Sequence, residues 1–206
     1  MIMTKPLEAA IFDLGGVVFG ISVENILKSW AKSMNIPPQE MAPKFGADSH
    51  YECFETNDIS PKQYREHVYK TFGARLSDEE FDRGWNSIYL GLLPGIEPLL
   101  KRLQQSLRLV ALTNTNSIHA RDWRVRYADI MTYFERVFAS HEIGARKPEP
   151  ESFQAVLDYL DIDPGKVAFF DDNPENVRGA IAVGIKGFVA TSPLEVSEKI
   201  QAILRA

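Results

Sequence analysis

The stretch "AAIFDLGGVVFG", residues 9–20, decides the fold expected for this chain. It is a run of strand-forming apolar residues that ends at one carboxylate, Asp13, and continues directly into Gly15 and Gly16. Burying a lone carboxylate at a strand end costs free energy unless another group compensates its charge. The stretch therefore predicts a buried strand whose terminal aspartate serves a function.

Short apolar runs of this kind recur along the chain, and each is followed by a helical pattern with its own start signal. We expect strands at residues 9–14, 108–113, 136–140, 166–171 and 186–190. Alternation of strands and helices predicts an α/β fold, a Rossmann-like doubly wound parallel sheet with right-handed crossovers on both faces. Such sheets bind ligands at the carboxyl ends of their strands.

One long interval, residues 20–92, breaks this alternation because it contains helical patterns and no convincing strand. Ser60-Pro61 and the capping box "SDEE" at 77–80 both start helices. A helical insertion directly after the first strand lies over that strand's carboxyl end, so we expect a lid above Asp13. The expected domains are a Rossmann-like core of residues 1–19 and 93–206 and an inserted helical cap of residues 20–92.

Composition limits the classes of protein that this chain can belong to. The 206 residues are 45% apolar and 25% charged, as in an ordinary globular protein, and the formal net charge is −5. Without a run of Lys or Arg, we expect neither nucleic acid nor membrane as a partner. A single cysteine, Cys53, and the charged Glu8 and Asp13 near the N-terminus indicate a cytoplasmic protein. The sequence leaves the oligomeric state, monomer or homodimer, open.

Four polar clusters fall at or just past the expected strand ends. They are Asp13, Thr113-Asn114, Lys147 in "GARKPEP", and Asp171-Asp172 in "AFFDDNPEN". Taken singly, an Asp before Gly is typical of a turn, Thr-Asn of a helix cap and a lone Lys of the surface. The adjacent acids favour a metal site, because neighbouring carboxylates repel each other unless a cation lies with them.

Together the four clusters contain what phosphoryl transfer needs. A carboxylate can attack phosphorus and form a covalent intermediate. A divalent metal held by carboxylates offsets the repulsion between that carboxylate and the phosphate, and hard oxygen ligands favour Mg²⁺. The donors for the phosphoryl oxygens would be Thr113, Asn114 and Lys147.

The motifs "FDLGGVV", "LTN", "ARKPEP" and "FFDDNPEN", in this order, resemble those of the haloacid dehalogenase-like hydrolase superfamily. The resemblance covers essentially the whole chain and is to the branch, subfamily IA, whose helical cap follows the first strand. The forms "TNTNSIH" and "FFDDN", together with Trp123, are most similar to the bacterial α-D-glucose-1-phosphate phosphatase subgroup. The resemblance therefore implies an Mg²⁺-dependent phosphatase acting on a small phosphorylated metabolite, such as glucose 1-phosphate.

The resemblance also implies roles for individual residues. Asp13 would be the nucleophile, Thr113 would hold the phosphoryl group, and Lys147 would bridge Asp13, the phosphate and the second acid. Asp172 would bind Mg²⁺, with Asp171 beside it in an inner or an outer position. The implied metal ligands are Asp13, the Gly15 carbonyl, Asp171 and Asp172, and the implied phosphate or substrate contacts are Gly16, Thr113, Asn114, Asn116 and Lys147.

Gly15 is the main departure from the family's pattern, which usually has a second Asp there. That residue binds the metal through its carbonyl and acts as general acid and base through its side chain. Gly15 retains only the carbonyl, so we expect metal binding without this acid–base help, which is worth roughly 10²–10⁴ in rate. A good leaving group, such as an anomeric sugar, would then be favoured. His119 is a possible replacement, although a histidine at a helix start is more typical of a cap or the surface.

The cap is expected to select the substrate. Tyr51, Glu55 and Trp85 lie in cap segments flanked by loop signals and are candidates for a sugar pocket, although such aromatic residues are also typical of a cap core. Two other functions stay open. One is a phosphate-binding or regulatory protein with little turnover, and the other, less favoured by the acid pair, is a metal-independent 2-haloacid dehalogenase that attacks carbon.

Overall fold

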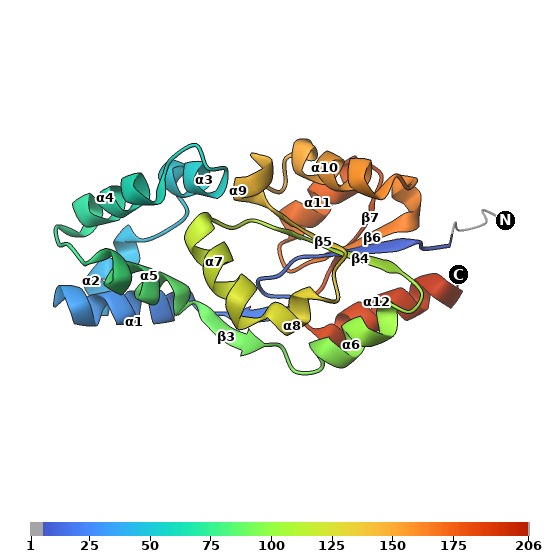
Figure 1. The fold of residues 1–206 in the computed structure, drawn as a ribbon, viewed down its shortest axis with the longest axis horizontal. Coiled ribbons are helices and arrows are strands. Elements are labelled where there is room, and N and C mark those ends of the chain that lie inside the picture. The colour runs from blue at the N-terminus through green and yellow to red at the C-terminus, as the bar shows by residue number, and fades with distance from the viewer. Residues whose placement is uncertain (1–5, 206) are drawn as a thin grey trace.

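The centre of the molecule is a parallel sheet of five strands (Figure 1). The computed structural model describes residues 6–205, so the parts of the expected core at residues 1–5 and at residue 206 lie outside the described residues. The sheet has the order β5-β4-β1-β6-β7, and every neighbouring pair is parallel. The strands are β1 (Ala9–Phe12), β4 (Arg108–Thr113), β5 (Arg136–Ala139), β6 (Val167–Asp171) and β7 (Lys186–Val189). The expected α/β fold is confirmed.

Helices cover both faces of this sheet because successive strand residues point to opposite sides. Phe12 and Phe170 pack into one apolar cluster, on the side of α6 and α12, whereas Ile11 and Phe169 pack into the other, beneath α10 and α11. The core helices are α6 (Ile96–Leu103), α7 (Ser117–Arg126), α8 (Ala128–Met131), α9 (Ser140–Ile143), α10 (Pro150–Leu160), η2 (Pro164–Lys166), α11 (Pro174–Ala182) and α12 (Pro193–Arg205).

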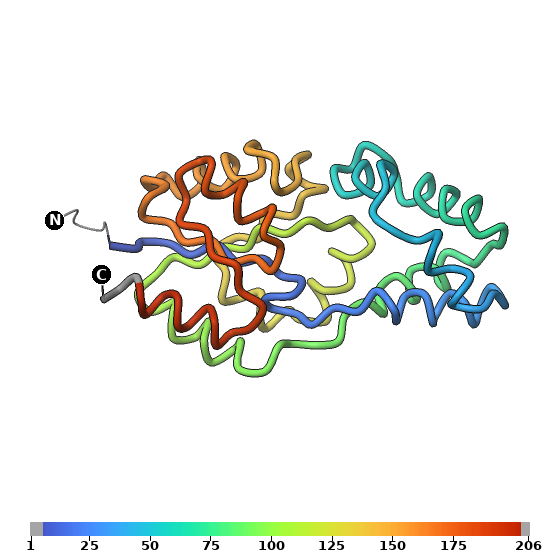
Figure 2. Tube along the Cα trace, turned by 180° about the vertical axis from the view of Figure 1, so that it is seen from behind, coloured from blue at the N-terminus to red at the C-terminus, as the bar shows by residue number. Residues whose placement is uncertain are grey.

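A helical unit projects from the end of the sheet at which the strands finish (Figure 2). Its helices are α1 (Val23–Met34), α2 (Pro38–Met41), η1 (Ala42–Lys44), α3 (Ser49–Glu55), α4 (Pro61–Phe72) and α5 (Asp78–Asn86). Ser60 and Ser77 form complete capping boxes at the starts of α4 and α5. This unit has its own apolar cluster, which includes Trp30, Phe81 and Trp85 and also receives Ile118 from core helix α7.

A two-stranded antiparallel sheet joins the core to this helical unit. It pairs β2 (Phe19–Ile21) with β3 (Tyr89–Leu92), inside or at the border of an interval for which no strand was expected. That expectation was wrong. The strands have three and four residues, and each contains a glycine, so their alternation is too short to distinguish them from a loop.

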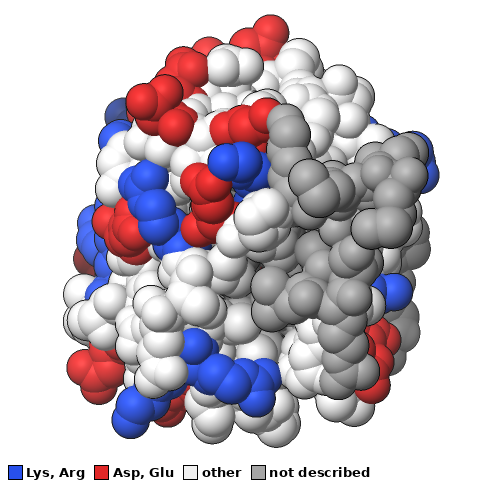
Figure 3. Space-filling model, turned by 90° about the vertical axis from the view of Figure 1, so that its right-hand side faces the viewer, with Lys and Arg blue, Asp and Glu red and all other residues white. Residues whose placement is uncertain are grey.

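Charged side chains of both signs are interspersed on the face of the core opposite the helical unit (Figure 3). Arg108 pairs with Glu135 there, and Lys166 pairs with Glu8. Within residues 6–205, no helix combines the length and the apolar character needed to cross a membrane.

Candidate active site

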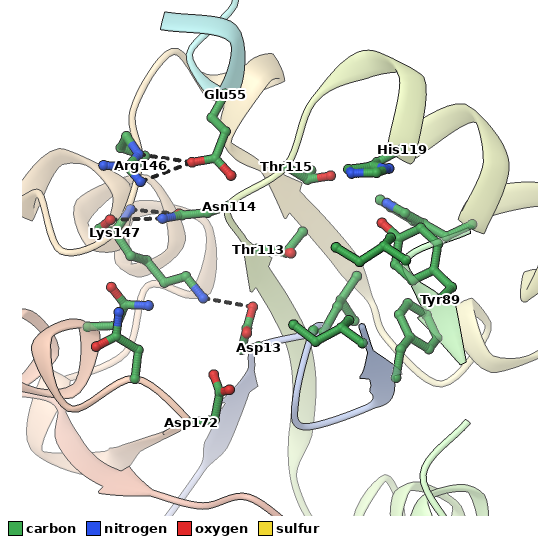
Figure 4. Close-up of a pocket in the computed structure, with 18 of the residues that line it drawn as sticks. Asp13, Glu55, Tyr89, Thr113, Asn114, Thr115, His119, Arg146, Lys147 and Asp172 are labelled. Atoms are coloured by element: carbon green, nitrogen blue, oxygen red, sulfur yellow. Dashed lines mark hydrogen bonds and ion pairs between the residues drawn. The ribbon is translucent and has the colours of Figure 1, made fainter. Parts of the chain in front are cut away.

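A cavity of about 330 Å³ lies at the carboxyl ends of β1, β4 and β6, between the core and the helical unit. Its inner end carries the polar side chains that follow those strands, and its outer end is formed by α3, β2, β3 and the start of α7. Figure 4 shows Asp13, Thr113, Lys147 and Asp172 converging at the inner end. Four separate sequence motifs therefore meet in one cavity, because the ends of neighbouring parallel strands lie at one edge of the sheet.

Lys147 connects the carboxylates at the inner end. Its ammonium Nζ donates hydrogen bonds to Asp13 Oδ1 at 2.8 Å and to Asp171 Oδ2 at 2.6 Å, and its side chain is 1% exposed. Asn114 fixes the backbone of Lys147, accepting from its N–H and donating to its carbonyl, both at 2.8 Å. The Asn114 side chain therefore positions Lys147. Asn114 also lines the cavity, and its contact with phosphate stays a prediction.

Asp171 and Asp172 differ in their surroundings although they are adjacent. Asp171 is fully buried, and its oxygens accept hydrogen bonds from Lys147, from the Asn173 backbone N–H and from the Asn176 amide. Asp172 is only partly buried and lines the cavity. Asp172 therefore faces the cavity, and Asp171 lies behind it.

We call Asp13, Asp171 and Asp172 the inner carboxylates. Their oxygens lie within 4.8 Å of one another, and Lys147 is the ammonium group among them. Burial raises the pKa of Asp13 to about 7, opposed by the charge of Lys147 and reinforced by Asp171. Burial and Asp171 also raise the pKa of Asp172. Three carboxylates around one ammonium favour a further cation, and the oxygen-only donor set fits Mg²⁺.

Gly16 and Gly15 are glycines for different reasons. Gly16 has a φ of 81°, and a Cβ atom there would lie 2.3 Å from Asp172 Oδ2, so a side chain would displace that carboxylate. Gly16 is not among the residues that line the cavity, but it lies against Asp172, which is, and its expected contact with phosphate stays a prediction. A Cβ at Gly15 would meet only the Ile21 side chain, at 3.6 and 3.7 Å, which is ordinary contact. The absence of a carboxyl group at Gly15 is therefore not enforced by lack of space.

His119 lies in the wall of the cavity, and it is neither an exposed residue nor the cap of α7. Its ring stacks on Trp85 at 4.8 Å between centroids, and its Nδ1 lies 2.9 Å from Asn86 Oδ1. Burial lowers the pKa of His119 to about 3. The imidazole is consequently neutral near pH 7, so His119 does not supply the proton that an Asp at position 15 would donate.

Trp85 and Asn116, both expected to contact substrate, lie behind the cavity wall. Trp85 is 1% exposed and stacks between Trp30 and His119, and its indole Nε1 donates to Asn116 Oδ1 at 3.3 Å. The same Asn116 oxygen caps α7 by accepting from the His119 N–H. Neither residue lines the cavity. The expected substrate contacts were wrong because helical spacing alone does not separate a cap core from a pocket wall.

Tyr51 and Glu55 do line the cavity, from α3. Glu55 has 2% of its side chain exposed and forms ion pairs with Arg146, whose Nε and Nη2 both lie 3.0 Å from Glu55 Oε2. Arg146 Nη1 also lies 2.9 Å from Glu52 Oε1. We call Glu52, Glu55 and Arg146 the outer ion network. Sequence reasoning missed Arg146, although it directly precedes Lys147 in "ARKPEP" and so follows the same strand end.

The remaining outer wall is apolar and aromatic, and it was also missed. It comprises Phe19, Ile21, Ile88, Tyr89 and Trp123. Four of these residues come from β2, β3 and the residue that precedes β3, so the unexpected small sheet supplies most of this wall. The outer end of the cavity therefore has one charged side and one apolar side.

A second cluster of metal-ligand side chains lies on the surface of the helical unit, formed by Asp48, His50 and His67. Asp48 caps α3 by accepting from the Tyr51 N–H, and its other oxygen lies 2.7 Å from His67 Nε2. The rings of His50 and His67 stack at 3.9 Å between centroids. These contacts hold the start of α3 against α4, and α3 in turn carries Glu55 into the cavity.

Comparison with known proteins identifies relatives of this chain that are named as phosphatases. A D-ribitol-5-phosphate phosphatase of Bacteroides thetaiotaomicron is 20% identical over 97% of this chain and 100% of the relative. A phosphorylated carbohydrates phosphatase of Thermotoga maritima is 26% identical over 87% of this chain and 83% of its own length.

This chain is also similar to solved structures. A HAD family enzyme from B. thetaiotaomicron, solved with magnesium and inorganic phosphate, superimposes with a TM-score of 0.80 at 29% identity, over 89% of this chain and 93% of that one. The family model described as haloacid dehalogenase-like hydrolase matches residues 7–184. The chain therefore belongs to the haloacid dehalogenase-like hydrolase family.

Proposed function

We propose that this protein is an Mg²⁺-dependent phosphatase that hydrolyses a small phosphorylated metabolite, a sugar or polyol phosphate such as glucose 1-phosphate, through a phospho-Asp13 intermediate. The observation that carries the proposal is the bridge from Lys147 Nζ to Asp13 and Asp171, below a cavity that Thr113 and Asp172 also line. The relatives named as a ribitol phosphate and a carbohydrate phosphatase support the substrate class.

The metal would be held by Asp13, Asp172 and the Gly15 carbonyl, with Asp171 supporting them from behind. When bound, Mg²⁺ would offset the inner carboxylates and the phosphate charge, and so permit an anion to approach an anion. Lys147 keeps Asp13 oriented and lowers the pKa of Asp13, which opposes the effect of burial. The Thr113 hydroxyl lies in the cavity wall as a donor for a phosphoryl oxygen.

The chemistry then has two steps. In the first, an Asp13 carboxylate oxygen bonds to phosphorus, and the ester oxygen leaves with its electron pair. The released oxygen takes up a proton from solvent. In the second, water attacks phosphorus and loses a proton to solvent, the bond from phosphorus to the Asp13 oxygen breaks, and inorganic phosphate leaves. Neither Gly15 nor the neutral His119 donates a proton to the leaving oxygen, so esters with an acidic leaving oxygen, such as anomeric phosphates, react fastest.

Phosphate release from a panel of phosphorylated metabolites tests this proposal. We expect release that requires Mg²⁺ and is abolished in Asp13→Asn, a variant that keeps the size of the side chain. Tight binding of phosphate esters without release would instead support a regulatory protein, the alternative that Gly15 favours. Halide release from a 2-haloacid without metal would support a dehalogenase.

A further inference from the structure

The outer ion network lies where the organic part of a phosphate ester would extend from the inner end. Figure 4 shows Glu55 reaching from the cap toward Arg146, on the opposite side from Tyr89 and His119. Glu55 and Arg146 both line the cavity, and Glu55 is almost completely buried. A buried ion pair in this place is in a position to distinguish substrates by charge. The inference that follows rests on the proposed phosphatase function.

The positive charges around the cavity are already neutralised. Arg146 and Lys147 are the two Arg or Lys residues among the described residues that line it. Lys147 is bonded to two inner carboxylates, and Arg146 is bonded to Glu52 and Glu55. The outer ion network has two carboxylates for one guanidinium, so its formal charge is negative. The outer end therefore offers no uncompensated cation to a second anionic group of a substrate.

A second anion would meet a direct penalty at the outer end. To reach Arg146, the second anion must displace Glu55. Glu55 would then be a buried carboxylate without its partner, and removing one partner of a buried ion pair is strongly destabilising. If the anion does not displace Glu55, it lies beside the negative charge of Glu55, and the buried surroundings screen the repulsion between the two charges only weakly. A hydroxyl group has neither problem, since it can donate a hydrogen bond to Glu55 while the ion pair stays intact.

Tyr51 holds the Glu55 carboxylate in position. Its side chain hydrogen-bonds to Glu55, and burial together with the Glu55 charge raises the pKa of Tyr51 well above its usual range. Tyr51 therefore remains a protonated donor that holds Glu55 in place. The apolar side of the outer wall, with Phe19, Ile88 and Tyr89, suits the C–H face of an uncharged polyol or sugar.

We propose that the Glu55–Arg146 pair makes this pocket selective for phosphate monoesters whose organic part is uncharged and hydroxylated, and that it rejects esters with a second anionic group. Glu55 is in this account a residue that determines specificity, and it takes no part in bond breaking at phosphorus.

Matched substrate pairs test the proposal. Glucitol 6-phosphate and 6-phosphogluconate differ only in a hydroxymethyl or a carboxylate group at the far end, as do glycerol 3-phosphate and 3-phosphoglycerate. With saturating Mg²⁺ we expect the wild-type kcat/KM to favour the uncharged member of each pair by about 100-fold, as close like charges cost several kcal/mol. In Glu55→Gln, Arg146 loses one partner, and the preference should fall about tenfold because kcat/KM for the carboxylated esters rises.

The matched control is Glu142→Gln, which breaks the partly exposed Glu142–Arg124 pair outside the cavity and should leave the preference unchanged. Equal wild-type kcat/KM values within each pair would overturn this inference while leaving the phosphatase function intact. No phosphate release from any ester, including p-nitrophenyl phosphate, would instead refute the proposed function. If Glu55→Gln does not fold, the wild-type ratios and Glu52→Gln, which removes the more exposed partner, decide the question.

Discussion

The two ends of the cavity differ in how their charges are balanced. At the inner end, three carboxylates surround one ammonium group, and burial raises the pKa of both Asp13 and Asp172. At the outer end, the guanidinium of Arg146 already lies between Glu52 and Glu55. The inner end therefore requires a divalent cation before it can accept a phosphate, whereas the outer end is complete without one and does not attract a further anion.

Breaking the inner end should have the largest effect on activity. We expect Asp172→Asn to lower kcat/KM by roughly 10²–10³ and to raise the Mg²⁺ concentration that gives half-maximal rate, because one of the charged metal ligands is lost. Steady-state rates over a Mg²⁺ titration measure both effects. The control is Asp48→Asn, in the surface cluster of the helical unit, since Asn also caps a helix. An Asp172→Asn enzyme with an unchanged Mg²⁺ requirement would contradict this assignment.

His119 keeps its part of the cavity wall uncharged. Acidification should reveal this in the stability of the protein. Its pKa is about 3 in the folded protein and 6.5 when exposed, so the unfolded chain binds more protons between these values. Stability is therefore complete above pH 6.5 and is lost as the pH falls toward 3. From pH 7 to pH 5 we expect His119 to cost about 2 kcal/mol in the free energy of unfolding, a factor of about 30.

Urea unfolding at the two pH values, compared with His119→Gln, isolates this contribution. The wild-type protein should lose about 2 kcal/mol more than the variant between pH 7 and pH 5. Equal losses in both proteins would show that His119 is solvated or charged in the folded state, contrary to its position against Trp85 and Asn86.

A general acid can also be added at the inner end of the cavity. Because a side chain at Gly15 would meet only Ile21 at ordinary contact distance, Gly15→Asp should fold and supply the missing acid. We expect about a tenfold higher kcat for alkyl phosphates, with a smaller change for anomeric and aryl esters, whose leaving oxygens need less help. Gly15→Asn is the matched control without an acid. If both variants behave alike, general acid catalysis is not what the wild-type site lacks.

Substitution of Trp85, which lies behind the cavity wall, should have the smallest effect on catalysis. Trp85→Phe removes an indole that stacks on His119 and donates to Asn116. We expect it to lower the free energy of unfolding by about 1–3 kcal/mol, as do other losses of buried packing and hydrogen bonds. Since Trp85 does not line the cavity, kcat/KM should stay within about threefold of the wild-type value. A large increase in KM without loss of stability would restore Trp85 as a substrate contact.

The sequence predicted the sheet and the inner end well because both depend on regular features. Buried parallel strands appear as apolar runs, and their carboxyl ends meet at one edge, so Asp13, Thr113, Lys147 and Asp172 were expected to lie together. They do line one cavity. The assignment of the two acids remained open in the sequence because adjacent residues leave a strand in different directions. Only the folded structure shows that Asp171 is the buried one.

The outer end was much harder to predict. Glu55 and Arg146 are 91 residues apart, and no periodicity indicates which surface of a cap helix will meet which loop of the core. The small sheet of β2 and β3 was missed because its strands are too short to show alternation. Trp85 illustrates the converse problem, since an aromatic residue on an amphipathic helix has the same spacing whether it faces a pocket or a core.

Detection of phosphate on Asp13 tests the central claim most directly. The protein is mixed with a substrate and Mg²⁺, quenched within one turnover, reduced with borohydride and digested, and the peptides are analysed by mass spectrometry. The account predicts reduction of an aspartyl phosphate at Asp13 alone, with a burst of leaving group of the same size, and no modification in Asp13→Asn or without Mg²⁺. Phosphate release at a full rate in Asp13→Asn, or trapping at another residue, would contradict it.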